Sequence, residues 1–162
     1  MVTDPHQTVL LEEAVHALIS DRQGTYVDCT YGRDGHSQAI ADQLDAQGRL
    51  MVIDRDEAAV EHARGRVAAD PRGIVQHGAF SSLKKFVHAH QLGDLDGVLL
   101  DLGVSSPQLD QAGRGFSFQQ AGPLDMRMDQ TQSETAEDWL SRASEQEITD
   151  VLKHYGEDRK ST

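Results

Sequence analysis

Residues 26–40, YVDCTYGRDGHSQAI, combine the end of an apolar run, an acidic residue, two glycines and the start of a helical pattern. Short apolar runs alternate with amphipathic stretches after this segment as well. Strands are predicted at residues 25–30, 49–54, 73–78 and 95–103, and helices at 9–19, 36–44, 57–67 and 81–90. This alternation favours an α/β fold with about four parallel strands and right-handed crossovers.

Three finer features of these elements follow from local patterns. Asp56 is placed to be the N-cap of the helix at 57–67. The run LDGVLLDLG at 95–103 is apolar enough for a strand buried on both faces. Thr131–Glu134 and Ser144–Glu147 have the capping-box spacing, which predicts two short helices late in the chain.

The composition narrows the class of protein. Fifteen Lys and Arg against 27 Asp and Glu give a net charge of −12, which argues against tight non-specific nucleic-acid binding but allows a local basic path. The single cysteine, Cys29, excludes a disulfide framework or a cysteine zinc site and is expected to be a small buried side chain. His88 and His90 do not share a helix face, so no metal site is predicted.

The N-terminal residues MVTDPHQTVLLEEAV contain neither a basic start nor a long apolar stretch. No run in the sequence approaches the roughly 20 residues that span a bilayer. We therefore expect a cytoplasmic protein with no signal peptide and no membrane segment.

The turn after the first strand is where an open α/β sheet binds its ligand. A nicotinamide fingerprint would need glycine at positions 32, 34 and 37, whereas this chain has Gly32, Asp34 and Ser37. A Walker A loop would need a Lys-Ser/Thr pair, which the turn lacks. The acidic Asp34 would also repel a pyrophosphate. Neither a nicotinamide dinucleotide site nor a Walker A site is therefore favoured.

S-adenosylmethionine removes this conflict, because it carries a sulfonium and an ammonium group and no phosphate. Asp28, at the end of the first strand, is expected to serve its methionine end directly or through water. Asp54, at the end of the second strand, is placed to accept hydrogen bonds from the ribose hydroxyls. Asp101, after the fourth strand, is expected beside the adenine or the methionine end. The alternative is that these are solvated turn or capping aspartates.

The regular pattern of strands and helices ends after Gly103. The next stretch is about 27 residues long, with turn signals and no clean period, and loops of this length are usually functional or disordered. Its aromatic, methionine and arginine content argues against a plain linker. We expect residues 1–130 to form a cofactor-binding domain and residues 131–162 to begin a helical insertion.

Three motifs in this stretch, DLGVSSPQLD, RGFSF and GPLDMRMD, follow DCTYGRDGHS in order. Together they closely resemble the cytidine-N4 methyltransferase H family of bacterial small-subunit ribosomal RNA. The resemblance implies a Rossmann-like class I S-adenosylmethionine-dependent methyltransferase sheet that methylates the exocyclic N4 of a cytidine in 16S rRNA of the small ribosomal subunit. By that resemblance, the cofactor contacts fall on Asp34, Gly35, His36, Asp54, Phe80, Asp101 and Gln108.

The substrate must leave its base stack to be methylated. Phe116 and Phe118 could stack on the base, although core packing is an equal alternative. Arg114 and Arg127 are candidate phosphate contacts, with salt bridges to neighbouring acids as the alternative. Asp101 is the candidate catalytic residue, as an acceptor for a hydrogen of the cytidine amine.

The chain departs from the family pattern in two places. The family usually has GRGGHS where this chain has GRDGHS, so Asp34 adds crowding if that position needs a positive φ. Its charge could face the ammonium of the ligand, and we expect weaker binding rather than none. Family members also continue well past the YGED motif, so the chain resembles a C-terminally truncated first half, either a fragment, a frameshifted gene product or a chain that needs a partner. The fourth strand would then be an open edge, which a homodimer or another partner could cover.

Overall fold

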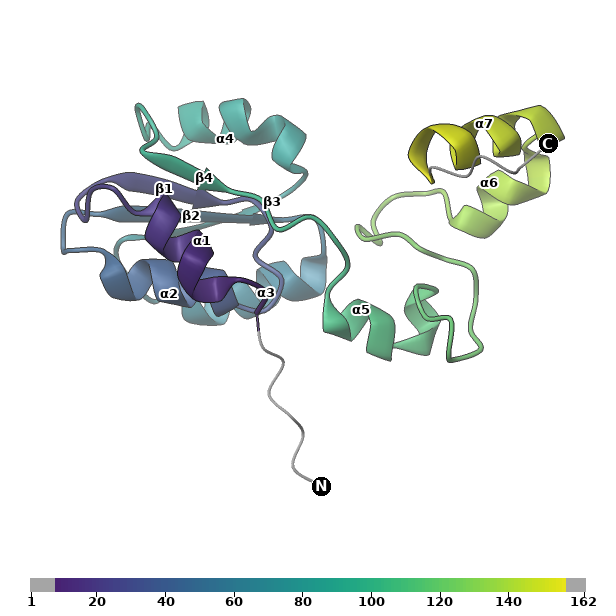
Figure 1. Cartoon of the computed structure of the whole chain (residues 1–162), viewed down its shortest axis with the longest axis horizontal. Coiled ribbons are helices and arrows are strands. Elements are labelled where there is room, and N and C mark those ends of the chain that lie inside the picture. Colours follow the sequence, from purple (N-terminus) through teal and green to yellow (C-terminus); the bar gives the residue numbers. More distant parts are fainter. Residues whose placement is uncertain (1–7, 157–162) are drawn as a thin grey trace, which may run out of the picture. The chain divides into compact units, whose positions relative to one another are not determined.

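The computed structural model describes residues 8–156, and the chain divides into two compact units, Met1–Ser106 and Pro107–Thr162. The first unit contains a four-stranded parallel sheet in the order β3-β2-β1-β4 (Figure 1). Its strands are β1 Thr25–Asp28, β2 Arg49–Asp54, β3 Gly73–His77 and β4 Gly97–Leu99. Its helices are α1 Leu11–Leu18, α2 Gly35–Gln43, α3 Glu57–Arg66 and α4 Leu83–Ala89, with a 3₁₀ turn η1 at Phe80–Ser82. The predicted parallel α/β fold is confirmed.

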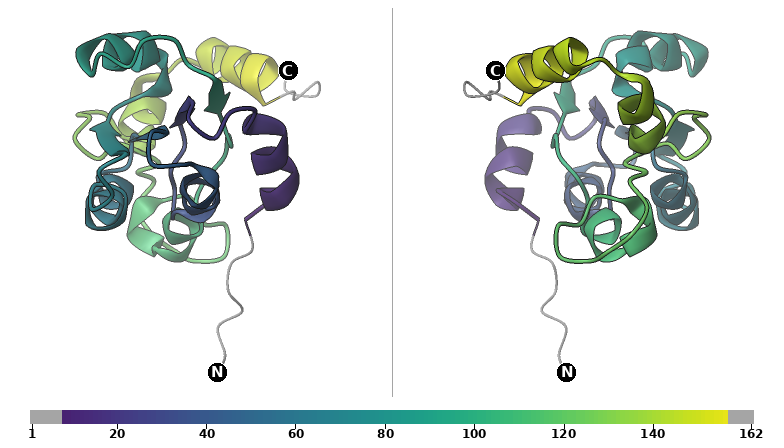
Figure 2. Two further views of the ribbon diagram at one scale, coloured as in Figure 1. Left: turned by 90° about the vertical axis from the view of Figure 1, so that its left-hand side faces the viewer. Right: turned by 90° about the vertical axis from the view of Figure 1, so that its right-hand side faces the viewer.

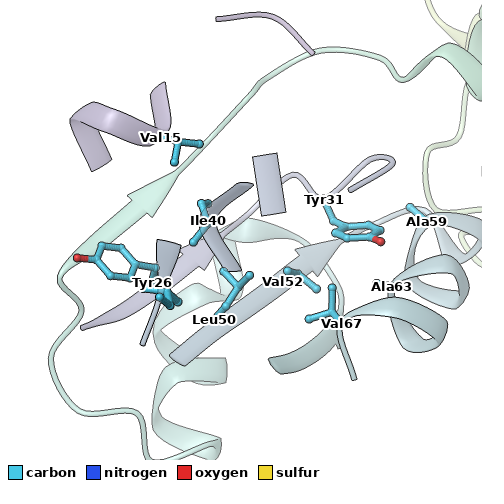
Figure 3. Packing of buried hydrophobic residues seen from close by; sticks show 10 residues of the cluster. Val15, Tyr26, Tyr31, Ile40, Leu50, Val52, Ala59, Ala63 and Val67 are labelled. Atoms are coloured by element: carbon cyan, nitrogen blue, oxygen red, sulfur yellow. The ribbon is translucent and has the colours of Figure 1, made fainter. Parts of the chain in front are cut away.

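Side chains alternate between the two faces of the central strands, as strand geometry requires. One face packs against α1, α2 and α3, and Figure 3 shows this cluster, which includes Tyr26 of β1, Ile40 of α2 and Leu50 of β2. The opposite face packs against α4, with Val27 and Met51 at its centre (Figures 1 and 2). Cys29 is buried on this second face, as predicted. The sheet is therefore covered by helices on both faces.

Two predicted helix starts are confirmed and one is wrong. Asp56 caps α3 by accepting a hydrogen bond from Ala58 N, and Ser144–Glu147 forms the capping box of α7, Glu145–Tyr155. The other box does not form at Thr131–Glu134, because helix α6, Ala136–Arg142, begins at Thr135, which pairs with Asp138 instead. Thr131 bonds to Asp129 in a preceding turn.

The second unit begins earlier than the boundary predicted at residue 130. It contains most of α5, Ser106–Asp110, followed by η2 at Ala112–Arg114 and then α6 and α7. The long loop bonds forward to α6, since Ala136 N donates to Asp125 O and Glu137 N donates to Leu124 O. The loop and the helices thus form one unit, and the predicted insertion at 131–162 extends past Gly156, the last described residue.

Strand β4 lies at the edge of the described sheet, as predicted, but is less buried than expected. It pairs with β1 and with no other described strand, and only three residues of the apolar run 95–103 form it. Leu100 and Leu102 are 45% and 67% exposed. The prediction that this run is buried on both faces is wrong, because β4 is only half-buried and the run leaves the sheet after Leu99, before the exposed Leu100 and Leu102.

We predict that this edge makes the chain self-associate. Leu102→Lys should lower the apparent mass in light scattering at high protein concentration, because it places a charge on exposed apolar surface in the segment that follows the edge strand β4. Ala69→Lys adds the same charge at an exposed position after α3 and should leave association unchanged. Equal association of all three proteins would mean that β4 is not the contact.

Candidate cofactor site

Asp54 fixes the turn at the carboxyl end of the sheet. Its Oδ2 accepts a hydrogen bond from Gly32 N at 2.9 Å, and its Oδ1 accepts one from Asp56 N at 2.8 Å. Gly32 has a φ of 55°, a conformation that favours glycine. Each carboxylate oxygen has two acceptor sites, so half-buried Asp54 keeps capacity for further donors such as a pair of hydroxyls.

Asp28 lies behind the turn and not on its surface. The residue is 1% exposed, its Oδ2 accepts a 2.5 Å hydrogen bond from Ser37 Oγ, and its Oδ1 accepts one from Thr30 N at 3.0 Å. Burial raises the pKa of this carboxyl despite these donors. The expected direct contact with a methionine end therefore has no support in this geometry, and Asp28 acts on the site through Ser37 and Thr30.

Asp101 and His36 are brought together from β4 and α2. The Asp101 side chain is 53% exposed, and its Oδ2 lies 3.9 Å from Nδ1 of the buried His36 ring. The other ring nitrogen, Nε2, lies 3.2 Å from Val9 O, which can only accept, so Nε2 carries a hydrogen and Nδ1 faces Asp101. Asp101 N donates to Thr30 Oγ1 at 2.8 Å, which ties the residue after β4 to β1.

Asp34 occupies the position at which the family motif GRGGHS has glycine. Its φ is 81°, which is the left-handed conformation considered for this position. Its side chain is buried, and Oδ2 pairs with Arg66 Nε of α3 at 3.1 Å. The carboxylate is therefore turned toward α3, where it pairs with Arg66. The next residue must be glycine, because a Cβ on Gly35 would collide with the Thr8 hydroxyl.

Phe80 and Gln108 complete the predicted cofactor contacts. Phe80 is 42% exposed and follows β3 by three residues, close in sequence to Gly78, whose N–H donates to Asp54 O. Gln108 is buried in α5 and belongs to the second unit. The first unit alone thus brings Gly35, His36, Asp54, Phe80 and Asp101 to the carboxyl side of the sheet.

The predicted substrate-binding arginines hold the loop of the second unit. Arg114 is 5% exposed and donates to the carbonyl oxygens of Arg127 and Met128, both at 3.1 Å. Arg127 forms a two-pronged ion pair with Asp125, at 2.9 and 2.6 Å, which lowers the pKa of that carboxyl. The geometry therefore favours the alternative in which these arginines bind neighbouring groups of the protein.

The two phenylalanines of this loop differ. Phe116 is half-buried, which agrees with the packing alternative, whereas Phe118 is fully exposed. Only Phe118 of the pair offers its whole ring to a partner.

Sequence reasoning missed four residues that support this site. Thr30 and Ser37 bond to Asp28, and His62 and Arg66 reach the turn from α3. Thr30 lies two residues after an aspartate, which is an Asx-turn signal that local reading could have found. Nothing in the local sequence pairs Arg66 with Asp34, because the contact is long-range.

The parallel sheet and its helix-covered faces define a Rossmann-like α/β protein, an arrangement that matches the methylase family whose model the chain fits. The chain belongs to the MraW methylase family, whose model matches residues 3–162. No helix within residues 8–156 is long and apolar enough to cross a membrane.

Similar proteins carry the name ribosomal RNA small subunit methyltransferase H. The chain is 56% identical to the one from Chromohalobacter salexigens, over 95% of the chain and 46% of the relative. It is 53% identical to the one from Methylibium petroleiphilum, over 97% of the chain and 50% of the relative. The relative from Burkholderia thailandensis is 52% identical, over 95% of the chain and 49% of the relative. The chain spans about half the length of the curated relatives it matches.

The buried carboxyl of Asp28 predicts a pH dependence of stability. Its pKa in the folded state is raised above the ordinary value of 3.8, so its contribution is complete below that pH and is lost as the pH rises through the folded-state pKa. Asp28→Asn keeps an acceptor for Thr30 N and can donate to Ser37 Oγ. We expect the free energy of unfolding of this variant, relative to that of the wild type, to increase as the pH rises. Urea unfolding of both proteins from about pH 4 to about pH 8 measures this difference. The same pH dependence of the free energy of unfolding in the wild type and in Asp28→Asn would contradict the prediction.

Proposed function

We propose that this chain is part of an S-adenosylmethionine-dependent methyltransferase that methylates the exocyclic N4 of a cytidine in 16S rRNA. The observation that carries the proposal is Asp54, whose carboxylate closes the glycine turn and keeps acceptor sites at the end of β2. The names of the relatives support ribosomal RNA of the small subunit as the partner. The cytidine amine, the ribosomal partner and a cytoplasmic location are inferred from the family resemblance.

The residues of the turn fit this cofactor, which supplies a methyl group on a positively charged sulfur. Asp54 would accept hydrogen bonds from the ribose hydroxyls, and Phe80 would offer an aromatic surface beside it. Gly35 and His36 would contribute the backbone at the start of α2. Asp101 is a half-exposed carboxylate suited to a cationic group. A phosphate-bearing cofactor would meet these acids unfavourably.

Asp101 is also the residue proposed to act on the substrate. A cytosine amine is a weak nucleophile because its lone pair is delocalised into the ring, and a carboxylate accepting one amine hydrogen favours the reacting geometry. Its backbone is anchored by Thr30, which limits its movement. Such positioning is the main contribution a protein makes to a transfer of this kind.

Phe118 is proposed to stack on the unstacked base or a neighbour. Its ring is fully exposed on a loop held by Arg114, so a base can stack on it without displacing another part of the described chain. Most of the RNA affinity must arise from local contacts, other parts of the protein or the assembled subunit, because the net charge of −12 disfavours general attraction.

A second function, cofactor binding by a partner-dependent or inactive unit, is favoured by one observation. No described strand pairs with the outer edge of β4, and Leu100 and Leu102 are exposed on either side of Asp101 in the sequence. A homodimer or another chain that covers this edge would then complete the site. Methyl incorporation into small ribosomal subunits by the 162-residue chain alone would exclude this function.

We predict that Asp54→Ala abolishes cofactor binding, because it removes both the ribose acceptor and the group that holds Gly32 N. Calorimetric titration with S-adenosylhomocysteine measures this, and the wild type should bind in the micromolar range. Asp54→Asn keeps one acceptor oxygen and should bind with intermediate affinity. Unchanged affinity in the alanine variant, or binding of a nicotinamide dinucleotide by the wild type, would refute the proposed site.

Phe118→Ala should weaken binding of purified small ribosomal subunits at least about fivefold, since stacking contributes about 1–3 kcal/mol per base. Its thermal unfolding should be unchanged because the ring is fully exposed. Tyr155→Ala removes another exposed aromatic ring, at the end of α7, and is the matched control. Equal losses in both variants would mean that the phenylalanine has no special role.

A further inference from the structure

Two side-chain contacts join the cofactor turn to helix α3. Tyr31 Oη lies 2.8 Å from His62 Nδ1, and Asp34 Oδ2 lies 3.1 Å from Arg66 Nε. His62 and Arg66 are four residues apart and so share one face of the helix. This face of α3 therefore contacts the turn at two points.

Asp34 needs such a contact more than any other residue of the turn. It has a φ of 81°, which a non-glycine residue rarely adopts, and it is 5% exposed. Its Oδ2 accepts no well-aligned hydrogen bond from the described residues, so the Arg66 ion pair is the interaction that balances the charge there. Burial raises the pKa of Asp34, and Arg66 is the largest opposing influence.

The surroundings place this carboxylate on the helix side of the turn. Asp34, Ser37 and Arg66 line a cavity of about 60 Å³ that also borders α2 and α3. A space of this size can hold water but is far below the roughly 300 Å³ of a cofactor pocket. This cavity is therefore too small to be the cofactor pocket, and the pair would act on cofactor binding through the backbone of the turn.

We propose that Arg66 is a positioning residue of the cofactor site, which holds Asp34 in its left-handed conformation and thereby fixes the backbone of Gly35 and His36. This inference rests on the proposed function. Without Arg66, the buried carboxylate would be uncompensated and would turn toward water, carrying the start of α2 with it. With glycine at position 34, the left-handed conformation has no side chain to compensate, and Arg66 becomes dispensable.

The test is a double-mutant cycle of Arg66→Ala and Asp34→Gly, read out by S-adenosylhomocysteine titration and by the free energy of unfolding in urea. Arg66→Ala should weaken binding about tenfold, the scale of coupling between contacting residues. Asp34→Gly should bind at least as tightly as the wild type. Adding Arg66→Ala to Asp34→Gly should cost no further affinity. Arg64→Ala is the matched control, because Arg64 is an exposed arginine of the same helix whose guanidinium pairs with Glu61, one turn earlier in α3.

The outcomes separate this inference from the function on which it rests. Equal losses from Arg66→Ala in both backgrounds, no loss in either, or a similar loss from Arg64→Ala would overturn the positioning role. If the wild type binds no S-adenosylhomocysteine, the proposed function fails. In that case the unfolding energies decide whether Arg66 holds the turn, since non-additivity supports the role and additivity rejects it.

Discussion

The first unit depends on one carboxylate at the end of its second strand. Asp54 receives the N–H groups of Gly32 and Asp56 on its two side-chain oxygens, and its own carbonyl receives that of Gly78. It thus fixes the turn before α2, the entry to α3 and the exit of β3 together. The same carboxylate is the proposed ribose acceptor, so fold and cofactor binding meet in one side chain. An alanine at position 54 would remove both roles at once, whereas an asparagine keeps one acceptor oxygen.

The parts of the fold that local patterns determine could be predicted from sequence. Strand β2 has the predicted bounds, and the Asp56 cap of α3 forms as expected, because strand alternation and capping are properties of a few neighbouring residues. The burial of β4 could not be predicted, because it depends on which strands pair with it. The predicted capping box at Thr131–Glu134 was wrong because the next four residues, 135–138, form a box with aspartate in place of glutamate, and this box directly precedes α6.

The candidate site shows the same limit. Acids at the ends of three strands were predicted to share one edge of the sheet, which they do, but sequence could not distinguish buried Asp28 from exposed Asp101. That difference depends on Ser37 and Thr30, whose hydroxyl groups take part in these contacts only once the chain is folded. The resemblance to a family indicated a glycine position at 34, and only the structure shows how an aspartate is accommodated there.

The two proposed tasks of the site have unequal structural support. Asp54 and Gly35 belong to the interior of the sheet and its adjoining turn, where neighbouring elements hold them on several sides. Asp101 follows an edge strand and is anchored through Thr30 Oγ1, which also donates to Asp28 Oδ1 at 3.4 Å. Whatever covers the free side of β4 therefore acts directly on the residue nearest the proposed chemistry. Under the proposed function, most of the predicted cofactor contacts therefore lie on the well-supported part of this unit, whereas the residue proposed to position the substrate amine lies next to the edge strand.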